Sequence, residues 1–61
     1  MTTLDLVKAM QIANMPMERI AAAIGCRTAI VDRACWLALD GSEISKVRAN
    51  RLLDTNREKW D

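Results

Sequence analysis

The chain carries MERIAAAIGCRTAIVDRA at residues 17–34, and this stretch decides its fold. Gly25 divides the stretch, and glycine favours the end of a helix because a positive φ costs it no steric strain. Apolar residues recur at helical spacing on both sides of the glycine, namely Ile20, Ile24, Val31 and Ala34. The stretch therefore predicts two short helices joined by a tight turn, with the small Ala21 where the two helices approach each other.

Helices are also expected on both sides of this central pair. Thr3 is the expected N-cap of a first helix, and Pro16 ends that helix because proline disfavours helical geometry in the residue before it. Thr28 is the expected N-cap of the third helix, which continues over residues 29–39. Ser42 is the expected cap of a last helix over about residues 42–58.

The composition agrees with an all-α fold. The chain has no Phe or Tyr and no run of alternating polar and β-branched residues. Sixty-one residues allow one domain, so we expect a small four-helix domain spanning residues 1–61. A domain of this size buries little surface, and its stability is expected to be marginal without a partner subunit.

The central stretch resembles a known motif. Ile20-Ala21, Ile24-Gly25, Val31 and Ala34 are similar to the core positions of helix-turn-helix DNA-binding proteins, especially the small regulators related to phage repressors and Cro. The resemblance implies a helix-turn-helix over about residues 17–37. It also implies a sequence-specific transcriptional regulator, such as a repressor, that acts as a homodimer with its third helix in the major groove. The chain departs from the family after Gly41, where its single helix is short.

The resemblance also implies which residues contact double-stranded DNA. Arg27 and Arg33 are expected to pair with guanine, and Ala29 to touch a thymine methyl. Lys46 and Arg48, with Arg51, are expected to contact phosphates, which position a protein without specifying sequence. The candidate DNA-binding residues are Arg27, Thr28, Ala29, Asp32, Arg33, Trp36, Lys46 and Arg48. Each of these arginines and lysines also fits an ordinary solvated surface position.

The last helix carries more apolar residues than so small a core needs. We therefore expect it to form the dimer surface, through Ile44, Val47, Leu53 and Trp60.

Several classes of protein are disfavoured by the residues present. There is no His, and Cys26 and Cys35 lack the paired spacing of a zinc site, so we expect no metal, no cofactor and no enzymatic activity. The two cysteines are expected to be free, mostly buried thiols. The chain shows neither a secretory signal nor an apolar run long enough for a bilayer, which predicts a cytoplasmic location and no membrane partner.

A protein-binding function on the same scaffold remains the alternative. The net charge is only +1, whereas many DNA-binding domains are clearly basic. An exposed Ile30 or Trp36 suits a protein contact better than a base. A small phage-type inhibitor or adaptor that binds a host protein would fit these features.

Overall fold

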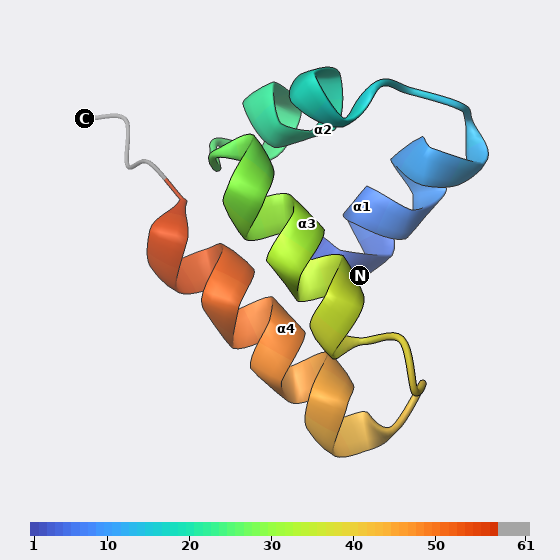
Figure 1. The fold of residues 1–61 in the computed structure, drawn as a ribbon, viewed down its shortest axis with the longest axis vertical. Helices are drawn as coiled ribbons and strands as arrows, with labels where there is room; N and C mark the ends of the chain where they lie inside the picture. Colours follow the sequence, from blue (N-terminus) through green and yellow to red (C-terminus); the bar gives the residue numbers. More distant parts are fainter. Residues whose placement is uncertain (58–61) are drawn as a thin grey trace.

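The computed structural model describes residues 1–57 of the chain, which contain four helices and no strand. The helices are α1 (Thr3–Ile12), α2 (Met17–Ile24), α3 (Thr28–Leu37) and α4 (Glu43–Asn56). In Figure 1, α3 and α4 lie side by side and run in opposite directions, and α2 crosses near the start of α3. The predicted all-helical domain of four helices is confirmed for this part of the chain.

The core is built from small and branched aliphatic side chains of all four helices. α3 lies at the centre and contacts each of the other helices. Ala34 of α3 and Ala49 of α4 are fully buried, and their small side chains let the two helices pack closely. The buried hydrophobic residues are Leu4, Val7, Ile20, Ala21, Ile24, Val31, Ala34, Ala38, Ala49 and Leu53.

The burial of Leu53 contradicts one expectation about the dimer surface. Its side chain is 0% exposed within a single copy, so it belongs to the core and offers no surface to a second copy. The spacing along α4 explains the error, because Leu53 lies four residues after buried Ala49 and shares its face. Trp60, which was expected at the same dimer surface, lies outside the described residues.

The helix ends differ in detail from the sequence-based expectations. Thr2, and not Thr3, caps α1: its Oγ1 accepts from the backbone N–H of Asp5 (3.2 Å), and the Asp5 carboxylate accepts from the backbone N–H of Thr2 (3.0 Å). Arg27, and not Thr28, is the N-cap of α3, without a side-chain hydrogen bond. Ser42 caps α4 as expected, because its Oγ accepts from the backbone N–H of Ser45.

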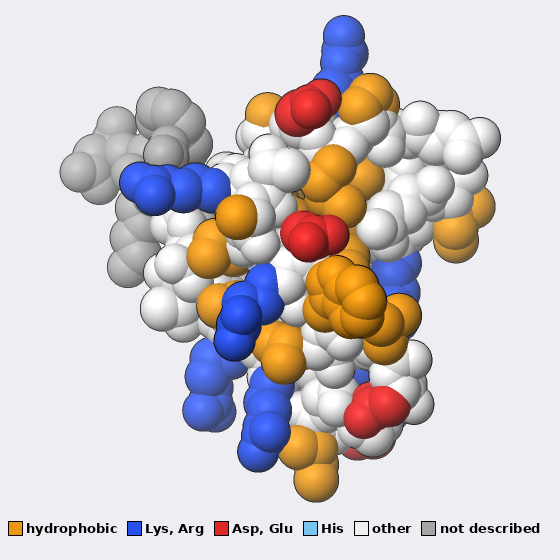
Figure 2. All heavy atoms as spheres, in the orientation of Figure 1, with side chains coloured by type: hydrophobic (Ala, Val, Ile, Leu, Met, Phe, Trp, Pro, Cys, Tyr) orange, Lys and Arg blue, Asp and Glu red, His pale blue; other side chains and the backbone are white. Residues whose placement is uncertain are grey.

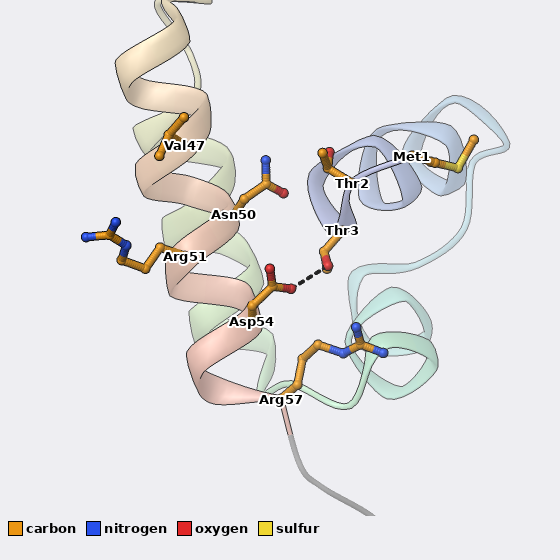
Figure 3. A pocket seen from close by; sticks show the side chains of 8 residues that line it. All are labelled: Met1, Thr2, Thr3, Val47, Asn50, Arg51, Asp54 and Arg57. Carbon is orange, nitrogen blue, oxygen red and sulfur yellow. Dashed lines mark hydrogen bonds between the residues drawn. The ribbon is translucent and has the colours of Figure 1, made fainter.

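Side chains of α4 complete the start of α1. The backbone N–H of Leu4 donates to Asn50 Oδ1 (2.8 Å), and Thr3 Oγ1 donates to Asp54 Oδ1 (2.6 Å). Figure 3 shows the second of these bonds, across a groove of about 840 Å³ between the start of α1 and α4. α4 therefore supplies acceptors that the first turn of α1 cannot find within its own helix.

Candidate nucleic-acid interface

The turn between α2 and α3 is set by Gly25. Gly25 has φ +76°, in the left-handed region. The backbone N–H of Gly25 donates to Ala22 O (3.3 Å) and that of Cys26 donates to Ala21 O (3.0 Å), which is the pair of bonds that closes a Schellman motif. The predicted tight turn after Ile24 is confirmed, and α3 starts three residues after the glycine.

The last turn of α4 holds this turn in place. Cys26 Sγ donates to the backbone carbonyl of Leu53 (3.4 Å), and Arg57 Nε donates to the backbone carbonyl of Ile24 (3.0 Å). The Arg57 cation thus lies at the C-terminal end of α2, where the helix dipole favours positive charge. Burial raises the pKa of the Cys26 thiol, so the thiol form is favoured there. Sequence reasoning missed both contacts, because they join residues 27 and 33 positions apart.

The outer face of α3 brings four predicted site residues together. Val31, Ala34 and Ala38 face the core, and the opposite side of the helix is exposed. That exposed side carries the outer stripe of α3: Ala29, Asp32, Arg33 and Trp36. Their spacing of i, i+3, i+4 and i+7 places them on one helical face. Arg27 and Thr28 are exposed at the start of the same helix.

Ile30 does not belong to this stripe. It is half-buried and packs against the core, so it does not provide the exposed apolar anchor that the protein-binding alternative invoked. Trp36 does provide one, because its side chain is 67% exposed. A shallow groove of about 190 Å³ runs beside it, lined in part by Met17 of α2 and Leu39.

The predicted phosphate contacts lie on α4, the helix beside α3. Lys46 is half-buried, and its Nζ lies 3.8 Å from Glu43 Oε1. Arg48 is exposed, and it lines a shallow depression of about 330 Å³ together with Ile44 and Val47. Figure 2 shows basic side chains over α4 with hydrophobic ones among them. The structure therefore groups Arg48 with the predicted dimer residues.

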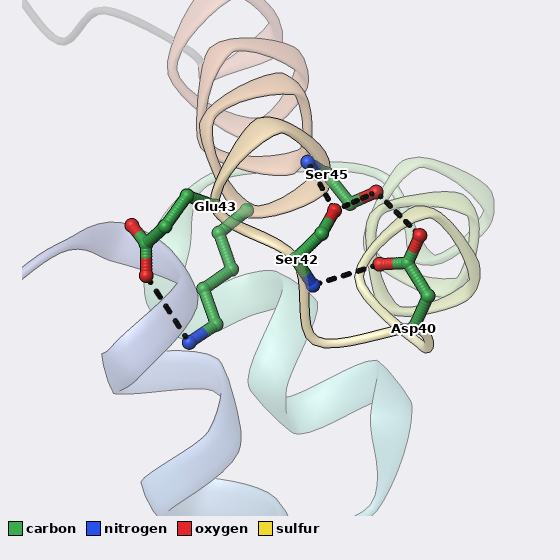
Figure 4. Close-up of polar contacts among 5 residues, drawn as sticks. Asp40, Ser42, Glu43 and Ser45 are labelled. Carbon is green, nitrogen blue, oxygen red and sulfur yellow. Dashed lines mark hydrogen bonds and ion pairs between the residues drawn. The ribbon is translucent and has the colours of Figure 1, made fainter.

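The turn that links α3 to α4 is held by a small polar network. Asp40 accepts from the backbone N–H of Ser42 (2.9 Å) and from Ser45 Oγ (3.0 Å), as Figure 4 shows. The backbone bond from Ser42, followed by the hydroxyl bond from Ser45, lowers the pKa of Asp40. Gly41 supports the turn with φ +72°. This turn ends α3 at Leu37, two residues earlier than expected.

The cysteines and the acidic residues form no recognisable metal site within residues 1–57. Cys26 and Cys35 are free, as predicted, and are half-buried where mostly buried thiols were expected. No group of three Cys, Asp or Glu side chains in that part of the chain could hold a metal ion. Among the same residues, every helix is too short or too polar to span a bilayer. Comparison with known protein families, curated proteins and solved structures finds no match to this chain.

Proposed function

We propose that this chain is a sequence-specific DNA-binding regulator that inserts α3 into the major groove. The observation that supports the proposal is the outer stripe of α3, which leaves Asp32, Arg33 and Trp36 exposed on one face while the opposite face is packed in the core. A helix that enters the groove needs such a free face on a rigid support. The α2–α3 turn, closed by Gly25 and held by Arg57, supplies that support.

Individual side chains have distinct parts in this proposal. Arg33 is exposed and forms no ion pair with a carboxylate of residues 1–57, so its guanidinium is available for the O6 and N7 edge of guanine. Arg27 and Thr28 lie at the start of α3, close to the groove edge, where they would bond a phosphate or a base. Ala29 presents a methyl group suited to thymine. Asp32 would accept from cytosine or orient an arginine.

The regulator would act as a homodimer. A single 61-residue unit makes few phosphate contacts, and two copies that each contact one half-site add their contacts on a palindromic sequence. Ile44 and Val47 support this expectation because they are 68% and 56% exposed on α4.

The proposal is tested by selecting, from a pool of random-sequence duplexes, those that the protein binds. The affinity of the protein for the selected duplexes is then measured by fluorescence anisotropy at low salt. We expect Arg33→Ala to weaken specific binding by about tenfold, which corresponds to the ~1–3 kcal/mol of one bidentate base contact. Arg33→Lys keeps the charge but loses the planar fork, so it should also lose specificity. Lys8→Ala removes the same charge from exposed α1 and serves as the matched control. Absence of salt-sensitive binding by the wild-type protein would refute the proposal.

A protein-binding inhibitor or adaptor is the second candidate, and Trp36 is the observation that favours it. Trp36 is 67% exposed and Leu39, beside it in the same groove, is 70% exposed. Large aromatic side chains that protrude from a surface often anchor protein partners. Trp36→Ala should then abolish capture of a stoichiometric protein from lysate. The DNA-binding proposal instead predicts that Trp36→Ala leaves salt-sensitive DNA affinity within a few fold of wild type, because phosphate contacts dominate that affinity.

A further inference from the structure

We propose that the shallow groove beside Trp36 binds the guanidinium of an arginine side chain on a partner protein. The groove has a volume of about 190 Å³ and lies where α3 meets the end of α1 and the start of α2. Its lining residues are Gln11, Met17, Asp32, Cys35, Trp36 and Leu39. The inference goes beyond the proposed DNA contact, which it does not require, and it gives the protein-binding candidate a ligand of stated chemistry.

The groove has the size and the apolar lining to hold one long side chain. It is smaller than the sites of most small-molecule ligands, which span roughly 300–1,000 Å³. Met17, Cys35 and Leu39 line it, and Trp36 stands beside them with 67% exposure. Such a lining accommodates a methylene stem, and the face of an indole attracts a cation within about 6 Å of the ring. The groove therefore favours a side chain that is apolar along its stem and cationic at its head.

The carboxylate of Asp32 selects for a cation. Asp32 is exposed and forms no ion pair with a cation of residues 1–57. Lys8 lines a neighbouring groove of about 330 Å³, but it too is outside ion-pair distance of Asp32. A wholly apolar partner would cover the Asp32 carboxylate without a counter-charge, and a phosphate would be repelled by it. An unpaired carboxylate beside an indole is instead complementary to a positively charged group.

Arginine fits this lining better than lysine does. Gln11 Nε2 donates to Cys35 Sγ (3.4 Å), and the amide oxygen of Gln11 accepts no hydrogen bond from residues 1–57. The lining thus offers two free acceptors, the Asp32 carboxylate and Gln11 Oε1, together with an aromatic face. A guanidinium is planar, stacks on aromatic rings and presents five N–H donors, whereas an ammonium is a strongly hydrated point charge.

The groove leaves the main proposed base contact of α3 free. Asp32 and Trp36 line the groove, whereas Arg33 does not. Figure 2 shows acidic and hydrophobic side chains next to each other over α3. A nucleobase can also stack on a tryptophan, but each nucleotide carries a phosphate, and no cation of residues 1–57 lines the groove. The lining therefore favours an arginine over a nucleotide.

Titration of the isotope-labelled full chain with the peptide acetyl-Gly-Arg-Gly-amide, followed by NMR, tests this inference. We expect saturable shifts of the Trp36 indole N–H and of the Gln11 side-chain amide. The dissociation constant should lie in the millimolar range, because one exposed ion pair and one cation–π contact are each weak. The matched peptide with citrulline in place of arginine keeps the shape but lacks the charge, and it should bind about fivefold more weakly or less.

Substitutions in the groove test the two groups that would hold the guanidinium. Asp32→Asn keeps the shape of the side chain and should weaken binding of the arginine peptide about threefold, and Trp36→Leu should do the same. Glu43→Gln removes the same charge from an exposed site on α4 and is the matched control, with no expected effect. Dispersed NMR spectra confirm that each variant folds.

Three results would overturn the inference. They are equal affinities for the arginine and citrulline peptides, unchanged binding by Asp32→Asn, and shifts of the Trp36 indole that only a single-stranded oligonucleotide produces. Arg33→Ala should leave the affinity for the arginine peptide within a few fold of wild type, because Arg33 does not line the groove. DNA binding is measured separately and depends on Arg33, so failure of this inference and failure of the proposed function are distinguishable.

Discussion

Replacing Leu53 by Ala tests whether this residue of α4 belongs to the core or to a surface of the domain. Leu53 is 0% exposed, so the substitution removes three buried carbon atoms and leaves a cavity among Ile20, Val31 and the other core residues. Three buried carbons are worth about 2.4 kcal/mol of transfer free energy, and with the cavity the loss reaches roughly 3–5 kcal/mol. A 61-residue domain has a total stability of only about 3–9 kcal/mol.

Thermal and urea unfolding followed by circular dichroism measure this loss. We expect the melting temperature to fall by roughly 12 °C or more, because 1 kcal/mol corresponds to about 4–8 °C in a domain of this length. Ile44→Ala is the matched comparison on α4, where the side chain is 68% exposed. It should cost less than about 1 kcal/mol at concentrations that keep the protein monomeric. If Leu53→Ala cost less than 1 kcal/mol, or if its effect vanished on dilution, Leu53 would be an interface residue and not a core residue.

Three further predictions concern polar and thiol groups. Asn50→Ala should lower stability by about 1–2 kcal/mol in urea unfolding, because a first-turn amide of α1 loses its acceptor, and an unchanged midpoint would contradict this. Hydrogen bonds from the backbones of Thr2 and Ser42 hold the pKa values of Asp5 and Asp40 below the usual 3.8. The two ionised carboxylates therefore contribute fully to stability above about pH 4, and this contribution is lost as the pH falls through their lowered pKa values. Melting temperatures measured from pH 6 to pH 2 should decline only at the acidic end. Burial raises the pKa values of the thiols of Cys26 and Cys35, so alkylation at pH 7 should be slow and should accelerate in denaturant; equal rates in both conditions would refute this.

The parts of the fold that depend on local sequence were predictable. Gly25 ends α2 in the left-handed conformation, and Ser42 caps α4, because each effect needs only a residue and its near neighbours. Helical spacing also identified the buried face of α3 through Val31 and Ala34. The same spacing indicated the outer stripe of α3, because the exposed positions are those that the core does not use.

The parts that depend on distant contacts were not predictable. Asn50 and Asp54 bond the start of α1 across some fifty residues, and nothing in their local sequence distinguishes them from solvated polar groups. The assignment of Leu53 failed because an apolar residue on the last helix fits either a core or an interface. Only the position of α4 against α3 decides between the two. The caps of α1 and α3 were each placed one residue late: Thr2 and Thr3 offer the same capping chemistry at the start of α1, and α3 begins after Arg27 without any side-chain cap, although Thr28 has the hydroxyl that a cap would use.

The bonds from α4 to the start of α1 have a consequence for synthesis on the ribosome. Leu4 and Thr3 emerge before their partners Asn50 and Asp54, which are 46 and 51 residues later in the chain. A nascent chain that stops before Asn50 lacks both acceptors, and it also lacks Leu53 in the core. At about 5–20 residues per second, α1 therefore waits several seconds for its stabilising contacts. Folding of this domain is expected to be a late event that follows the emergence of α4, rather than a stepwise process that proceeds from the N-terminus.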